Sequence, residues 1–142
     1  MKILVVANET AESAALRRHV ARLAAGADAQ VLVVAPALIG RLDFWATDDR
    51  RARSAAGRRL DECLGALGDA GVDAGGYIGD SDPLQAIEDA LSVFDADEIV
   101  ISTHPEGSSN WLARKVVARA RVRFRQPIHH ILTARSQDRA VA

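Results

Sequence analysis

The sequence is poor in cysteine, in aromatic residues and in net charge, and each shortage excludes a class of protein. Its single cysteine, Cys63, excludes an internal disulfide and a metal site built from several cysteines. The net charge of -1 over 142 residues gives no general attraction to nucleic acid or to an anionic membrane. Aromatic residues make up only 4%, so a core has to be built from Val, Leu, Ile and Ala.

Long hydrophobic runs are also lacking. The apolar stretch at the N-terminus, residues 3–7, is too short for a membrane span or for the core of a signal peptide with its cleavage site. We therefore expect a cytoplasmic protein with no membrane partner.

What the sequence has is a regular alternation of short apolar runs and longer helical patterns. Continuous apolar runs such as ILVV and VLVV are typical of strands buried on both faces of a parallel sheet. Strands that alternate with helices form βαβ units with right-handed crossovers. The predicted strands cover residues 2–7, 30–35, 72–78, 98–102 and 127–133, and the predicted helices cover residues 11–25, 48–67, 83–94 and 110–124.

The fold class that follows is α/β: a single-domain, three-layer, doubly wound parallel sheet of five strands, Rossmann-like in its layers. The domain is expected over residues 1–134, with a polar tail over residues 135–142. Pro83 is expected in the first turn of the third helix, and Gly68 and Gly71 are expected to close the second. Cys63 lies among leucines at helical spacing, which predicts a small core residue.

The candidate ligand site follows from this fold, because open parallel sheets bind ligands beyond the carboxyl ends of their strands, where the winding reverses. Asn8 and Thr10 come after the first strand. A hydroxyl-rich loop runs from Ser102 to a helix expected to begin at Asn110, and the free N–H groups of a helix N-terminus favour an anion. The alternative that Thr10, and Ser109 or Asn110, serve only as helix caps stays open.

Three segments of the sequence, ILVVANETAES, GDSDPLQAIEDAL and QPIHHIL, resemble the universal stress protein family, and the resemblance covers nearly the whole chain. It implies the fold predicted above, a regulatory or binding role in a stress response, and a homodimer paired through the C-terminal strand. In nucleotide-binding members an acidic residue at the end of the first strand contacts adenine, and here Asn8 stands at that position.

The family's phosphate loop is a glycine, two residues, a glycine, nine residues, then a glycine and a hydroxyl residue. Counted from the end of the fourth strand, these positions are Ser102, Pro105, Lys115 and Val116, and none of them matches. Glycine lets the backbone approach a phosphate, whereas proline has no N–H and a fixed φ. The sequence therefore predicts a divergent member without the usual glycine motif, which does not bind ATP in the usual way.

The alternative is a nucleotide- or anion-binding sensor with a modified site at the carboxyl ends of the first and fourth strands. His104 stands where the family often has histidine, Gly107 could supply a displaced backbone cradle, and Lys115 could supply a charge. No cofactor is established, and the candidate ligands are ATP, AMP, cyclic AMP and phosphate. The candidate contacts are Asn8, Thr10, Ser102, Thr103, His104, Gly107, Ser108 and Lys115.

Three other functions are less favoured. Residues 114–125 are basic without an acid and residues 80–98 hold seven acids without a base, but an apolar stripe on the same helix indicates solvation and ion pairing rather than nucleic-acid binding. His129 and His130 are adjacent on a strand and point to opposite faces, so they cannot chelate one metal ion. No nucleophile–base pair or metal-ligand spacing is visible, which disfavours an enzyme such as a slow phosphohydrolase.

Overall fold

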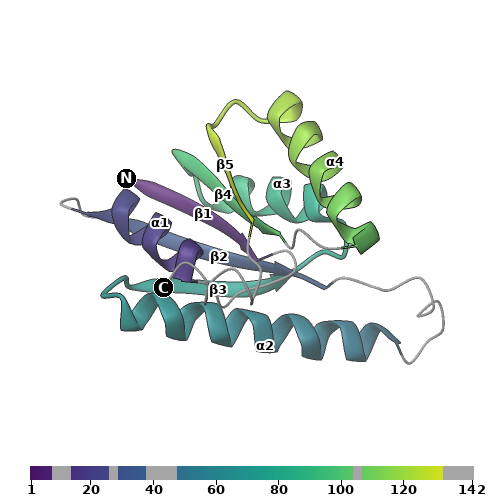
Figure 1. Cartoon of the computed structure of the whole chain (residues 1–142), viewed down its shortest axis with the longest axis horizontal. Coiled ribbons are helices and arrows are strands. Elements are labelled where there is room, and N and C mark those ends of the chain that lie inside the picture. The colour runs from purple at the N-terminus through teal and green to yellow at the C-terminus, as the bar shows by residue number, and fades with distance from the viewer. Residues whose placement is uncertain (8–13, 26–28, 38–47, 104–106, 133–142) are drawn as a thin grey trace.

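The computed structural model describes residues 1–7, 14–25, 29–37, 48–103 and 107–132 (Figure 1). Within these residues, strands and helices alternate as the sequence predicts. In chain order the elements are β1 (Lys2–Ala7), α1 (Ala14–Ala24), β2 (Gln30–Pro36), α2 (Asp48–Asp69), β3 (Ala74–Gly79), α3 (Pro83–Val93), β4 (Glu98–Thr103), α4 (Gly107–Arg123) and β5 (Ile128–Leu132).

The five strands form one parallel sheet in the order β3-β2-β1-β4-β5. The chain winds outward from β1 through β2 to β3 and then returns past β1 to β4 and β5. The winding direction therefore reverses between β1 and β4, and the doubly wound α/β fold predicted from the sequence is confirmed. The last strand, β5, lies at one edge of the sheet.

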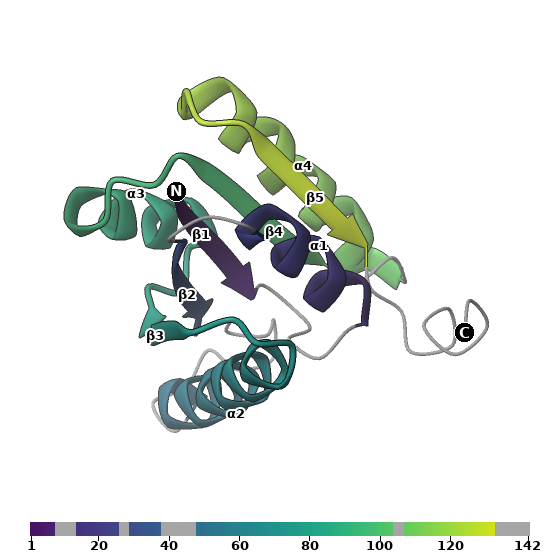
Figure 2. The ribbon, with the colours of Figure 1, turned by 90° about the vertical axis from the view of Figure 1, so that its left-hand side faces the viewer.

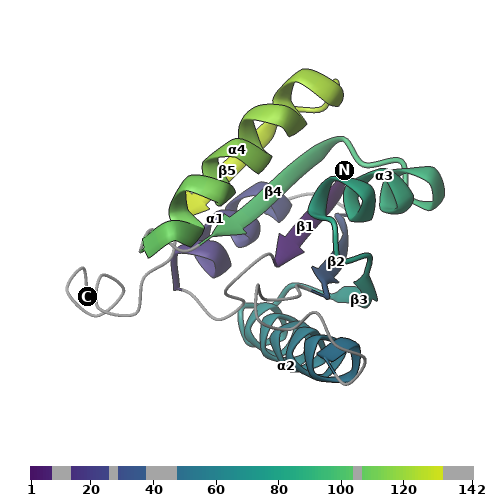
Figure 3. The same ribbon diagram turned by 90° about the vertical axis from the view of Figure 1, so that its right-hand side faces the viewer.

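Helices cover both faces of the sheet: α1 and α2 lie on one face, and α3 and α4 on the other (Figures 2 and 3). Strand β1 supplies Ile3 and Val5 to the first layer and Leu4 and Val6 to the second, and all four side chains are fully buried. Each such burial stabilises the fold by about 1.5–3 kcal/mol. This two-sided burial explains why the strand sequences are continuously apolar.

The C-terminal end of α2 is a Schellman motif. The N–H of Gly71 donates to the carbonyl of Gly68 at 3.0 Å, and the N–H of Val72 donates to the carbonyl of Leu67 at 2.8 Å. Gly71 has a φ of 82°, a conformation that glycine adopts at no steric cost. The prediction that glycines close this helix is confirmed.

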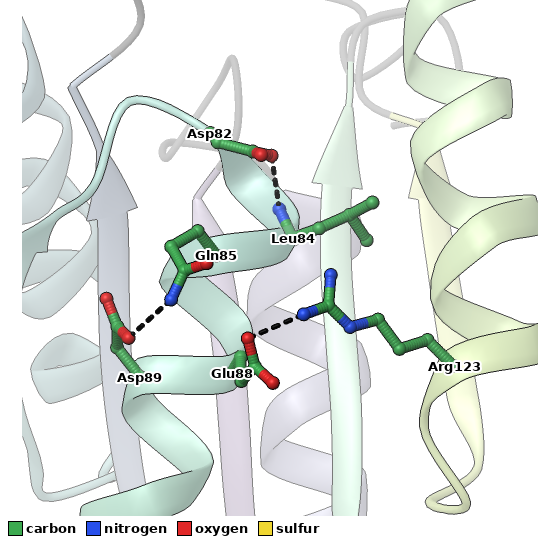
Figure 4. Close-up of polar contacts among 6 residues, drawn as sticks. All are labelled: Asp82, Leu84, Gln85, Glu88, Asp89 and Arg123. Atoms are coloured by element: carbon green, nitrogen blue, oxygen red, sulfur yellow. Dashed lines mark hydrogen bonds and ion pairs between the residues drawn. The ribbon is translucent and has the colours of Figure 1, made fainter.

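The N-terminal end of α3 is capped as its sequence suggests. Asp82 is the N-cap, and its Oδ1 accepts a hydrogen bond of 3.0 Å from the N–H of Leu84 (Figure 4). Pro83 occupies the first helical turn, where a missing N–H costs nothing. Cys63 is buried in the first core layer, also as predicted.

Several predicted boundaries differ from the structure; the second helix, for example, ends at Asp69 rather than at residue 67. The third strand begins at Ala74 rather than Val72, because the N–H of Val72 is already bonded to Leu67 in the helix-closing motif. The fourth helix begins at Gly107 rather than Asn110, so Ser109 and Asn110 lie inside α4 and neither is its N-cap. Small polar residues are tolerated in a first helical turn because the N–H groups there have no intrahelical acceptor.

None of the helices in the described ranges combines the length and the hydropathy that crossing a membrane requires.

Candidate functional site

The candidate site lies at the carboxyl ends of β1 and β4, where the winding of the sheet reverses. The two strands pair in parallel up to Ala7 and Ser102, which stand opposite each other. Ser102 is fully buried and is the one buried polar residue among those described. Thr103 is the last residue of β4. Asn8, Thr10 and His104 lie outside the described residues.

Helix α4 begins close to this point. Only residues 104–106 separate Thr103 from Gly107, so the start of α4 lies at most about 14 Å from the end of β4. Gly107 and Ser108 hold the first two positions of α4, a glycine followed by a hydroxyl residue. The first N–H groups of a helix have no intrahelical acceptor and carry the positive end of its dipole. This helix start can therefore accept an anion.

Lys115 is not close to the start of the helix. It is the ninth residue of α4, about 12 Å along the axis from Gly107, and its side chain is exposed. The fixed spacing of the family's loop thus places Lys115 and Val116 in the third turn of α4. Of the candidate contacts in the described residues, Ser102 and Thr103 end β4 and Gly107 and Ser108 begin α4, whereas Lys115 lies in the third turn of that helix.

Arg59 of α2 is a residue at this edge of the sheet that the sequence reasoning missed. Its side chain is half-buried, and Nη2 donates to the carbonyl oxygen of Pro36, the last residue of β2, at 2.5 Å. Strand β2 is the neighbour of β1, so a guanidinium group lies at the carboxyl edge beside the candidate site. No sequence signal distinguished Arg59 from the other arginines of residues 50–59.

The described residues include one cysteine, Cys63, and it is not a reactive one. Burial raises the pKa of the Cys63 thiol to about 12, so Cys63 stays protonated and is not a nucleophile at neutral pH. No group of three His, Cys, Asp or Glu side chains within the described ranges can hold a metal ion. The helix start at Gly107, close in sequence to Thr103, is of the kind that binds an anion.

The basic residues of α4 pair in part with the acidic residues of the preceding segment, as the sequence suggested. Arg123 contacts Glu88 of α3 at 2.5 Å, and Arg125 contacts Asp95 at 4.0 Å (Figure 4 shows the first pair). Both pairs are exposed to solvent, and pairs of that kind contribute about 0–1 kcal/mol.

Comparison with known proteins gives the class of this fold. No protein-family model matches the sequence, and no curated protein matches it significantly. Solved structures do match, with more than nine-tenths of both chains aligned in each of two examples. A universal stress protein from Archaeoglobus fulgidus in complex with dAMP aligns over 92% of this chain and 97% of its own, with 21% identity and a TM-score of 0.66. A universal stress family protein from Arabidopsis thaliana with AMP bound aligns over 96% and 94%, with 14% identity and a TM-score of 0.57.

A third match is a universal stress family protein from Burkholderia pseudomallei, which aligns over 90% of this chain and 94% of its own at 18% identity, with a TM-score of 0.63. The class defined by these matches is the Rossmann-like α/β fold of universal stress proteins. This chain has that fold, which is the fold that the resemblance in its sequence implied.

Proposed function

We propose that this chain is a divergent, cytoplasmic universal stress protein that acts as a regulatory or binding protein in a stress response. We also propose that its site binds a nucleoside monophosphate rather than ATP in the usual pose. The observation that carries the second proposal is the start of α4: Gly107 and Ser108 open the helix only three residues after β4, beside the reversal between β1 and β4. Two structures with the same fold are described with AMP or dAMP.

The short connection favours a single phosphate over a triphosphate. One helix start offers a few convergent N–H donors, which is enough to bind one phosphate group. Residues 104–106 are few, and Pro105 among them has no N–H to donate. The β- and γ-phosphates of ATP would therefore find fewer backbone donors than a glycine-rich loop offers, and we expect ATP to bind no more tightly than AMP.

For the base, we propose that Asn8 replaces the acidic residue that the family resemblance places after the first strand. A carboxylate accepts hydrogen bonds only, whereas an amide both donates and accepts. Adenine presents a donor at N6 and acceptors at its ring nitrogens. An amide is suited to this edge without adding a negative charge near the phosphate. Thr10 and His104 remain candidate contacts, because Thr10 follows the first strand and His104 stands where the family often has histidine.

Calorimetric titration of the full chain with AMP, ATP, cyclic AMP and inorganic phosphate tests the proposal. We expect AMP to bind and ATP to bind no more tightly. Gly107→Pro removes one N–H while proline remains compatible with the first helical turn, so AMP affinity should fall about tenfold, as the loss of one hydrogen bond to a charged group predicts. Gly107→Ala keeps the N–H and is the matched control. If none of the four ligands binds at millimolar concentration, the proposal is wrong.

Lys115 is tested with its own control. Arg119 is also an exposed cation of α4, one turn further along. If Lys115 contacts the phosphate, Lys115→Ala alone weakens AMP binding. If Lys115→Ala and Arg119→Ala weaken AMP binding by equal, small amounts, and the effect vanishes at high salt, Lys115 contributes only to the long-range electrostatic attraction of AMP.

We further propose a homodimer paired through β5. In support, β5 lies at the edge of the sheet, where β4 is its paired neighbour among the described residues, and an edge strand is a template for pairing with a second chain. Light scattering at micromolar concentration should give twice the mass of the chain, and a monomer would refute the dimer.

A further inference from the structure

Three side chains from three different elements meet between helix α1 and the edge strand β5. Nε2 of His129 on β5 lies 3.2 Å from Oε1 of Glu98 at the start of β4. The rings of His129 and of His19 on α1 have centroids 4.9 Å apart and planes tilted by 55°. Helix α1 is thus joined to the edge of the sheet by a contact that contains two titratable rings and one carboxylate.

Two polar atoms in this cluster are buried without a hydrogen-bond partner in the described part of the chain: Nε2 of His19 and Oε2 of Glu98. A proton on Nε2 of His19 would be a buried donor with no acceptor, which is costly. The folded arrangement therefore selects the neutral His19 ring, with its proton on Nδ1.

The surroundings of His19 also favour its neutral form, because their net effect is to lower its pKa. Burial lowers the pKa of His19, and the positive charges of His129 and Arg22 lower it further, while Glu98 raises it by a smaller amount. Glu62 and Asp69 of α2 line a cavity with Arg17 of α1, and His19 is not among the residues that line it. Strands β1 and β2 present only apolar side chains to this layer in the described residues, namely Ile3, Val5, Ala7, Val31, Val33 and Ala35.

We propose that His19, Glu98 and His129 form a proton-sensitive contact that holds α1 against β5 while the His19 ring is neutral and opens when both rings carry a proton. In the open state the His19 ring turns out to solvent, where its second N–H finds water. Glu98 then keeps its contact with His129, and α1 loses one of its attachments to β5.

Opening of this contact would expose part of the edge strand β5. On the α1 side, β5 is covered through His129 and through Ile131, which packs against the core beneath α1 and α2. Its other face is covered by α4, where Ile128 joins the second core cluster. Loss of the His19 contact would loosen one of the two covers of β5 and leave the rest of the sheet in place.

NMR titration of the histidine rings in the full chain is the first test. We expect the His19 ring to titrate below the usual histidine range of about 6.5. We also expect its contact with the His129 ring, seen as cross-relaxation between ring protons, to disappear over the same pH interval. A His19 ring that titrates in the usual range, or that keeps the contact when protonated, would overturn the proposal.

Unfolding by urea at pH 7.5 and pH 5.5 is the second test. Because the folded state disfavours the proton on His19, the unfolded state binds more protons below about pH 6.5, and stability falls as the pH falls through that region. With an unfolded-state pKa of about 6.5, the ratio of unfolded to folded protein should rise by at most about tenfold from pH 7.5 to pH 5.5, and the rise comes closer to that limit the further the pKa of His19 is lowered. His19→Gln should remove the part of the stability loss at low pH that comes from protonation of His19.

His130→Gln is the matched control, since His130 is adjacent to His129 and points to the opposite face of β5. It should keep the pH-dependent loss that His19→Gln removes. An equal loss in the wild type and in His19→Gln would refute the proposal, and if His19→Gln does not fold, the ring titration of the wild type decides the question.

Discussion

Gly76 of β3 lies directly against Leu60 of α2: a Cβ atom on Gly76 would stand 2.5 Å from Cδ1 of Leu60. The same Cβ would stand 2.5 Å from the carbonyl oxygen of Val33 in the neighbouring strand. A leucine side chain can move aside, but a backbone oxygen inside a sheet cannot. The absence of a side chain at this one position therefore sets how closely α2 approaches the sheet.

Gly76→Ala should destabilise the protein by about 1–3 kcal/mol, the range for overpacking a core. Gly75→Ala is the control, because Gly75 and Gly76 are both exposed but a Cβ on Gly75 would meet nothing within 4 Å. Its effect should stay within about 0.5 kcal/mol. Urea unfolding of the two variants measures the difference, and equal stabilities would contradict the packing described here.

The cap of α3 gives a second prediction. Asp82→Ala removes the acceptor for the N–H of Leu84 and should cost about 1 kcal/mol of stability, whereas Asp82→Asn keeps an acceptor and should cost little. Asp95→Ala serves as the control, since Asp95 is 83% exposed and its contact with Arg125 is 4.0 Å long. A cost for Asp95→Ala as large as that for Asp82→Ala, measured by thermal or urea unfolding, would show that the cap is unimportant.

Cys63 should be inert in the native protein. Its thiol is 1% exposed, and burial raises its pKa to about 12, so almost no thiolate is present at pH 8. We expect no reaction with an aromatic disulfide reagent over hours in buffer and one equivalent of reaction at once in denaturant. Because the chain has one cysteine, the count is unambiguous. Rapid reaction of the folded protein would mean that α2 opens readily.

The ion pair between Arg123 and Glu88 should contribute little. Its side chains are 42% and 51% exposed, and exposed pairs give about 0.2–1 kcal/mol in double-mutant cycles. A cycle with Arg123→Ala and Glu88→Ala should return a coupling in that range, smaller at 1 M salt than at low salt. A coupling well above this range that is insensitive to salt would indicate a buried, structurally important pair.

Much of the fold could be predicted because its signals are local. The continuously apolar strands at Ile3–Val6 and Val31–Val34 reflect burial by two helical layers, and Pro83 and Gly71 mark helix ends by their backbone restrictions. The boundary errors arose where two local preferences compete. Val72 has a strong strand propensity, but its N–H is used by the helix that precedes it.

The candidate site could be predicted only in outline. That ligands bind at the reversal of the winding follows from the fold class, but the pairing of Ala7 with Ser102 depends on a sheet order that local sequence does not encode. Counting residues from the family motif gives Lys115 and Val116 as its last two positions, and both lie in the third turn of α4. The contact of His19 with His129 joins residues 110 positions apart, and no periodicity reports it.

The binding site itself is tested most directly by recording backbone amide spectra of the full chain while AMP is added. The amides of Thr103, Gly107 and Ser108 should shift together and saturate, while that of Gly75, on the opposite edge strand, stays in place. Saturable shifts confined to residues far from the ends of β1 and β4, or no shifts at millimolar AMP, would contradict the account.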